Sequence, residues 1–258
     1  MSRIDPSFAY AQARLQARYG MRPGEADWSH FASTADLGAL LQVLRGSPLA
    51  RWVDRLGPRP DVHALERHLR GEWAHDVDDV AAWQPESWRD GIRWLRWIAY
   101  VPALQKLARG GRAPAWMRDD PVLGPVVARE PRERAVALKS TELAPLAAGF
   151  EPPHDVAGAW RKHWRALWPA RHPGRAPLDA MLGMLAAQRQ KLEDLPDNAT
   201  STESFATLER RLQSMFRRFP LGPAASVAYL GLLALDLRRM RGALATRALR
   251  ESANASPQ

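Results

Sequence analysis

Apolar residues recur every three or four positions along most of this chain, and the strict alternation typical of strands is hard to find. The first stripe follows Pro6 and consists of Phe8, Ala11, Leu15 and Tyr19. Asp5 precedes this stripe as the expected N-cap, and Gly20 is expected to end the helix. The pattern predicts an all-α protein.

Further helices are expected wherever this spacing returns between Pro and Gly breaks. They cover residues 34–44, 49–56, 62–73, a Trp-rich segment from 85 to 107, and 132–146, 155–168, 178–192 and 205–219. Pro102 is expected to kink the Trp-rich helix, and Thr200 with Glu203 fits a capping box before the segment 205–219. Gly222-Pro223 opens the longest run, whose apolar positions resemble a coiled-coil seam: Leu230, Leu233, Leu237, Met240, Leu244 and Ala248.

The domain organisation follows from the distribution of Pro and Gly. Residues 110–177 are punctuated by both, whereas the flanking parts carry long helical patterns. We expect a single all-helical domain over 1–258, with possible lobes at 1–109 and 178–250 joined by the Pro/Gly-rich middle 110–177. The apolar run 88–107 contains five charged residues, so it should not span a membrane. The segment Met1–Pro6 lacks the apolar core of a signal peptide, and we therefore expect a soluble protein.

Composition narrows the classes of function. With 258 residues and no cysteine, the chain can have no disulfide, thiolate metal site or thiol nucleophile. The net charge of +9 is compatible with nucleic-acid binding, and residues 205–250 hold nine arginines against Glu209 and Asp236. However, only four of the 37 basic residues are lysine, which is typical of biased coding, so nucleic acid is not the favoured partner.

The sequence contains no recognisable catalytic motif. It has no GxxxxGK[ST] phosphate loop, no GxSxG elbow and no HExxH pair. The strongest metal candidate is Glu72 with His75, because this spacing places both side chains on one helical face. Helical di-iron sites use two such pairs and two further glutamates, and this is the one pair found within the expected helices. Asp76, Asp78 and Asp79 beside it are interpreted as a solvated acidic turn. We expect no enzyme activity, no metal and no cofactor.

Eleven tryptophans stand at helical spacing among leucine and isoleucine. This arrangement favours core packing over base stacking. The alternative is an exposed Trp-lined partner surface, since aromatics and arginine together are typical of interface hot spots.

Two stretches resemble the C/d family, whose members are subunits of V-type and archaeal-type rotary ATPases. Near the start these are the Tyr- and Arg-bearing helix Phe8 to Arg18, Trp28 and Phe31, the leucine-rich segment Asp36 to Arg45, and Ser47-Pro48-Leu49. Near the end they are Phe205 to Glu209, similar to the family's "fxxLE" helix, and Val227 to Arg241, similar to its closing "vaYlxxxExxnLR" helix. Asp236 stands where the family has Glu, Arg239 where it has Asn, and Met240 where it has Leu. The family is usually longer, and the Trp-rich segment 83–118 has no counterpart in it.

The resemblance implies an irregular multi-helix array of degenerate helical repeats without an active site of its own. It implies a non-catalytic coupling subunit that links the central stalk to the membrane rotor ring on the cytoplasmic face. Its partners would be other rotary ATPase subunits. On this reading Arg238, Arg239 and Arg241 are candidate partner-binding residues for acidic stalk or ring surfaces. The alternatives are a basic helical nucleic-acid-binding or regulatory protein, and a helical metalloprotein centred on Glu72 and His75.

Overall fold

The computed structural model describes residues 6–193 and 202–255, and within them it contains twelve α-helices, six 3-10 helices and no strand. The all-α prediction is therefore confirmed. The α-helices are α1 (Ala9–Gly20), α2 (Glu25–Ser33), α3 (Leu37–Arg45), α4 (Val62–Ala82), α5 (Glu86–Arg93), α6 (Val101–Ala108), α7 (Gly124–Val127), α8 (Arg134–Lys139), α9 (Val156–Ala166), α10 (Arg175–Glu193), α11 (Thr202–Arg218) and α12 (Pro223–Ala255). The 3-10 helices are η1 (Pro6–Phe8), η2 (Ala50–Trp52), η3 (Trp94–Tyr100), η4 (Ala115–Met117), η5 (Pro131–Glu133) and η6 (Ala144–Phe150).

The chain divides into two compact units. The first comprises residues 1–92 and 170–258, and the second comprises residues 93–169. The first unit thus brings together α1–α4, most of α5, and α10–α12, while α6–α9 belong to the second. The single domain over 1–258 and its lobes at 1–109 and 178–250 stay predictions.

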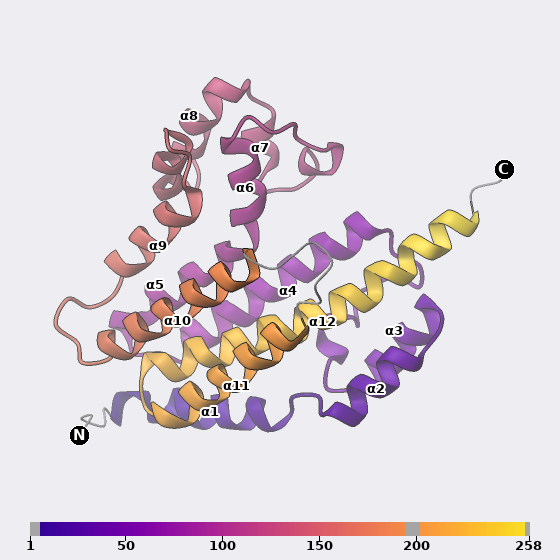
Figure 1. Cartoon of the computed structure of the whole chain (residues 1–258), viewed down its shortest axis with the longest axis horizontal. Coiled ribbons are helices and arrows are strands. Elements are labelled where there is room, and N and C mark those ends of the chain that lie inside the picture. Colours follow the sequence, from indigo (N-terminus) through magenta and orange to yellow (C-terminus); the bar gives the residue numbers. More distant parts are fainter. Residues whose placement is uncertain (1–5, 194–201, 256–258) are drawn as a thin grey trace. The chain divides into compact units, whose positions relative to one another are not determined.

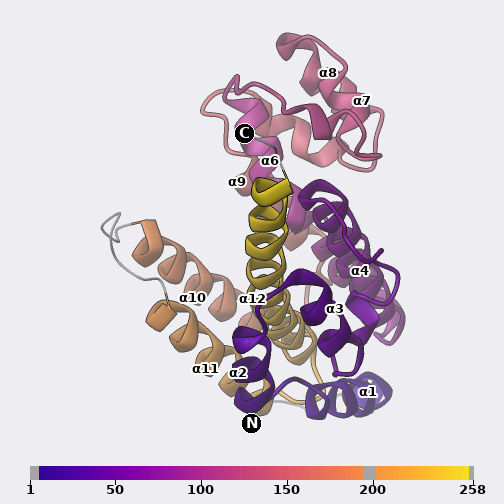
Figure 2. The same ribbon diagram turned by 90° about the vertical axis from the view of Figure 1, so that its right-hand side faces the viewer.

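Helix α12 is the central element of the first unit, where it lies beside α1, α4 and α11 (Figures 1 and 2). The predicted seam explains this position. Five of its six residues are buried, and Leu237 is half-buried. The helix begins at Pro223, which needs no backbone N–H at a helix start.

The leucine pattern at residues 34–44 also forms the helix expected from it. Helix α3 buries Leu37, Leu40, Leu41 and Leu44. The Asp36 side chain caps it by accepting a hydrogen bond from the Ala39 amide at 2.7 Å. Helix α2 was not predicted, although two of its residues, Trp28 and Phe31, are buried. The predicted caps at Asp5 and Thr200 lie outside the described residues.

The second unit is built from short helices. The Asp155 side chain caps α9 by accepting a hydrogen bond from the Gly158 amide at 2.8 Å. Gln105 on α6 accepts a hydrogen bond from the amide of Val156 at 3.0 Å, which joins α6 to the start of α9.

Nine of the eleven tryptophans are buried, and Trp83 and Trp116 are partly exposed. Core packing is therefore confirmed for most of them.

The Trp-rich segment differs from the single kinked helix that was expected. Helix α5 gives way to the 3-10 segment η3, and Pro102 lies in the first turn of α6. Proline lacks an N–H and its ring collides with the carbonyl four residues earlier, so the chain starts a new helix there. Residues 132–146 likewise form η5, α8 and part of η6 in place of one helix.

Within the described part of the chain, no helix has both the length and the apolar character needed to cross a membrane.

Candidate functional site

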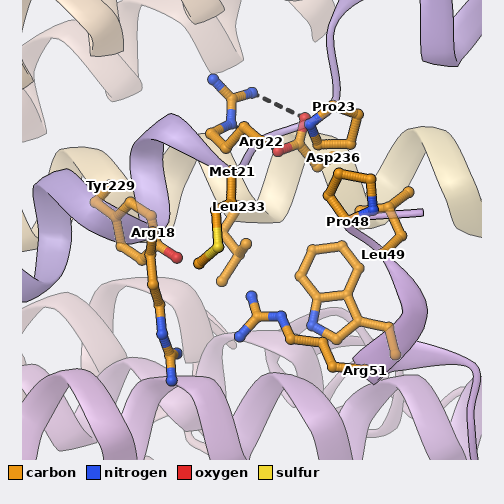
Figure 3. A pocket seen from close by; sticks show the side chains of 11 residues that line it. Arg18, Met21, Arg22, Pro23, Pro48, Leu49, Arg51, Tyr229, Leu233 and Asp236 are labelled. Carbon is orange, nitrogen blue, oxygen red and sulfur yellow. Dashed lines mark hydrogen bonds and ion pairs between the residues drawn. The ribbon is translucent and has the colours of Figure 1, made fainter. Parts of the chain in front are cut away.

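A pocket of about 410 Å³ lies within the first unit (Figure 3). Three segments that are far apart in the sequence line it. The end of α1 and the chain after it contribute Arg18, Met21, Arg22 and Pro23; the segment around η2 contributes Pro48, Leu49, Arg51 and Trp52; and α12 contributes Tyr229, Leu233 and Asp236.

Arg22 and Asp236 form one wall of this pocket, and Figure 3 shows the guanidinium of Arg22 facing Asp236. The Arg22 Nε donates to Asp236 Oδ2 at 2.7 Å and Nη2 donates to Oδ1 at 2.8 Å. Nη2 also donates to Glu209 on α11 at 3.0 Å. The two paired side chains are only 10% and 6% exposed. This bidentate pair therefore joins the end of α1 to the middle of α12.

Burial acts on both members of this pair. It is the largest influence on Asp236 and raises the pKa of that carboxyl, although the hydrogen bond from Arg22 works against the rise. Burial alone would lower the pKa of Arg22. Its hydrogen bonds and charge interactions with Asp236 and Glu209 outweigh burial, so the pKa of Arg22 is raised. Arg22 therefore stays protonated.

A second ion-pair cluster is centred on Asp76 of α4, whose side chain is 4% exposed. Asp76 Oδ1 accepts from Arg51 and from Arg18 Nη1, the latter at 3.3 Å, while Oδ2 accepts from Trp52 Nε1 at 2.7 Å. Arg18 Nη2 also donates to Asp79 at 2.6 Å. Burial is the main reason that the pKa of Asp76 is raised, and the charge of Arg51 opposes it. The prediction of a solvated acidic turn at Asp76, Asp78 and Asp79 is thus wrong, because all three residues lie within α4 and Asp76 is buried.

The pocket has the chemistry of a binding site. The described residues that line it combine apolar side chains, Trp52 and Tyr229 with three guanidiniums and one carboxylate, and none of them is His, Ser, Thr, Lys or Cys. Each guanidinium faces at least one carboxylate, so the three positive charges are balanced within the protein. Burial raises the pKa of the Tyr229 phenol, which therefore stays protonated at neutral pH. The arrangement can hold an apolar group.

The three arginines predicted to bind partners lie on α12 outside this pocket, and each contacts a different element of the first unit. The Arg238 guanidinium lies 3.5 Å from the centre of the Phe205 ring on α11. Arg239 pairs with Glu25 of α2 at 3.1 Å and covers the Trp28 ring at 4.6 Å. Arg241 pairs with Glu66 of α4. Their role in binding a partner stays a prediction, and the same intramolecular contacts would compete with nucleic-acid phosphates.

Among the described residues, the structure places no third ligand beside Glu72 and His75, the candidate metal ligands. Among the described residues, no group of three or more His, Cys, Asp or Glu side chains is arranged to hold a metal ion. Glu72 lies 3.8 Å from Arg55, and His75 is exposed.

Sequence reasoning missed Arg18, Arg22 and Arg51. A signal for one of their partners was present, because Asp236 follows Leu233 by three residues and precedes Met240 by four on the buried face of α12. A carboxylate at such a position requires a positively charged or hydrogen-bonding partner.

No protein-family model, no curated protein and no solved structure matches this chain.

Proposed function

We propose that this chain is a non-catalytic coupling subunit of a V-type or archaeal-type rotary ATPase, linking the central stalk to the membrane rotor ring. The proposal rests on one observation, which is that an ion pair joins the two parts of the chain that resemble the C/d family. Arg22 lies within the stretch Phe8–Leu49 that resembles the opening of the C/d family, shortly after the first helix of that stretch, and the segment that resembles the family's closing helix contains Asp236. These two residues, 214 positions apart, form a bidentate ion pair.

This ion pair gives a physical meaning to the difference between Asp236 and the Glu that the family has at this position. Where the family has Glu, this chain has the shorter carboxylate, and both oxygens of that carboxylate accept hydrogen bonds from the Nε and Nη2 edge of Arg22. The change therefore keeps a carboxylate at this position, and in this chain that carboxylate joins the two segments.

The mechanical part of the role also has support. A coupling subunit transmits torque, which requires a stiff body between two binding partners. Helix α12 has 33 residues, so it extends for about 50 Å at 1.5 Å per residue. It is held laterally by α1, α4 and α11. On this proposal the chain is peripheral to the inner face of the membrane, and ATP is hydrolysed by other subunits.

The proposal is tested by affinity purification of the tagged full chain from native membranes at its normal level of expression. We expect stalk and rotor-ring subunits of a rotary ATPase to be recovered with it. A tagged component of an unrelated membrane complex serves as the control. Recovery of the folded chain without any rotary ATPase subunit would overturn the proposal.

A further inference from the structure

One face of α1 carries a row of aromatic and arginine side chains. Tyr10, Arg14 and Arg18 follow one another at intervals of four residues, which places them on the same side of the helix. Tyr10 is 56% exposed, which is unusual for so large an aromatic side chain in this protein. Trp83, at the end of α4, adds a partly exposed ring to this row.

These side chains stack on one another. The Arg14 guanidinium lies 5.3 Å from the centre of the Tyr10 ring and 6.0 Å from that of Trp83. The Arg18 guanidinium lies 4.7 Å from the same Trp83 ring. Arg18 is also paired with Asp76 and Asp79, whereas in the described part of the chain Arg14 contacts rings and no carboxylate. Arg14 thus presents a positive charge that no carboxylate among the described residues compensates.

The row leads directly to the pocket. Arg18 belongs to both, and Met21, which lines the pocket just after α1, is 61% exposed. We call the combined surface the α1 face; it consists of Tyr10, Arg14, Arg18, Met21, Trp83 and the pocket.

The two parts of the α1 face differ in the group they can accept. Inside the pocket the guanidiniums are already balanced by Asp76, Asp79, Asp236 and Glu209, so a further charge gains little there. An apolar side chain would instead cover Met21, Pro48 and Leu233. Outside the pocket, Arg14 can attract a carboxylate. Arginine with exposed aromatics is the composition of protein-binding hot spots.

We propose that the α1 face binds a segment of another rotary ATPase subunit, which inserts one large apolar side chain into the pocket and sets a carboxylate against Arg14. This inference rests on the proposed function. Arg14 precedes Met21 by seven residues, so the two binding points are about 10 Å apart along the helix. A partner helix therefore carries its acidic residue about two turns from its apolar anchor.

The test uses the full chain in native membranes with a photo-crosslinking amino acid in place of Met21 or, separately, Tyr10. Control chains carry it at Val136 or Leu249, which are similarly exposed at 66% and 59%. After irradiation, adducts are identified by mass spectrometry. We expect adducts with one rotary ATPase subunit from Met21 and Tyr10, and none with that subunit from either control.

The charge is tested in the same system. Arg14→Glu should lower the adduct yield at Met21 roughly tenfold, because a like charge then faces the partner carboxylate. Arg14→Lys should keep most of it, and Arg250→Glu, which changes another exposed arginine, serves as the charge-matched control. Circular dichroism verifies that each variant is folded.

The outcomes separate the two proposals. If ATPase subunits are recovered but adducts form only from the control positions, the α1 face is not the binding surface and the proposed function still stands. An adduct between two copies of this chain, or only with lipid, would also overturn the inference. If no ATPase subunit is recovered at all, both proposals fail.

Discussion

The guanidinium of Arg22 binds both carboxylate oxygens of Asp236, at 2.7 and 2.8 Å, across 214 residues of sequence. Because Arg22 follows α1 and Asp236 lies within α12, this pair fixes the first helix of the chain against the last. It also forms a wall of the pocket, so the stability of the first unit and the shape of its candidate site depend on the same contact.

Replacement of Arg22 by Ala leaves Asp236 buried without its main partner. Breaking a buried ion pair from one side costs about 3–5 kcal/mol, so we expect the free energy of unfolding to fall by about 3 kcal/mol. Urea unfolding followed by tryptophan fluorescence measures this. The double variant Arg22→Met with Asp236→Leu removes both charges and should lose much less. A change below about 0.5 kcal/mol in Arg22→Ala would show that the pair contributes little.

The raised pKa of Asp76 predicts a specific pH dependence. Burial makes the folded chain bind a proton at Asp76 more readily than the unfolded chain, whose carboxyl titrates near 3.8. Between pH 3.8 and the pKa of Asp76 in the folded chain, unfolding therefore releases this proton. The part of the free energy of unfolding that Asp76 contributes falls as the pH rises through this range. Asp76→Asn removes that dependence. The stability lost in the variant should thus be larger near pH 4 than at pH 7; a loss that grows with pH would contradict the raised pKa.

Gly149, in η6 of the second unit, allows a close approach of two backbone segments. A Cβ at this position would lie 2.5 Å from the Cα of Val156 at the start of α9. Gly149→Ala should therefore destabilise the protein by about 1–3 kcal/mol, measured as a lower free energy of unfolding. Gly242→Ala on α12 is the control, because nothing lies within 4 Å of its added Cβ. The control should be neutral or gain about 0.5–1 kcal/mol, and equal effects at both sites would refute the close approach.

Substitution of Arg241 tests whether the exposed arginines of α12 bind a partner. Its pairing with Glu66 is exposed, so Arg241→Glu should cost at most about 1 kcal/mol of stability. If acidic stalk or ring surfaces bind here, the variant should recover several-fold less of the ATPase subunits from native membranes. Arg250→Glu, on the same helix, should recover the normal amount. Unchanged recovery with Arg241→Glu would confine Arg241 to its contact within the first unit.

The helices that sequence predicted best are those whose apolar residues define a single face. In α3 and α12, leucines spaced by three and four residues lie on one face of the helix, and the structure buries most of them. The segment Trp94–Tyr100 has apolar residues on all sides, so its period does not distinguish an α-helix from a 3-10 helix. Its neighbour Pro102 then determines where the next helix starts.

The candidate site was harder to predict because its residues come from segments that only tertiary packing brings together. The three neighbouring aspartates at 76–79 suggested a solvated turn. The helical period would have placed Asp76 correctly, since it follows Trp73 by three residues and precedes Val80 by four, and both are buried. In contrast, no local pattern links Arg22 to Asp236, because the partner of a buried charge is set by the packing of distant helices.

The most direct test of the proposed role is the coupling of ATP hydrolysis to ion transport in inverted membrane vesicles from the native source. ATP-driven ion uptake and ATP hydrolysis are measured with the chain present, after its gene is deleted, and after the deletion is complemented. We expect deletion to abolish ATP-driven uptake while the catalytic subunits still hydrolyse ATP, and the wild-type gene to restore uptake. Uptake that continues undiminished without this chain would contradict a coupling role.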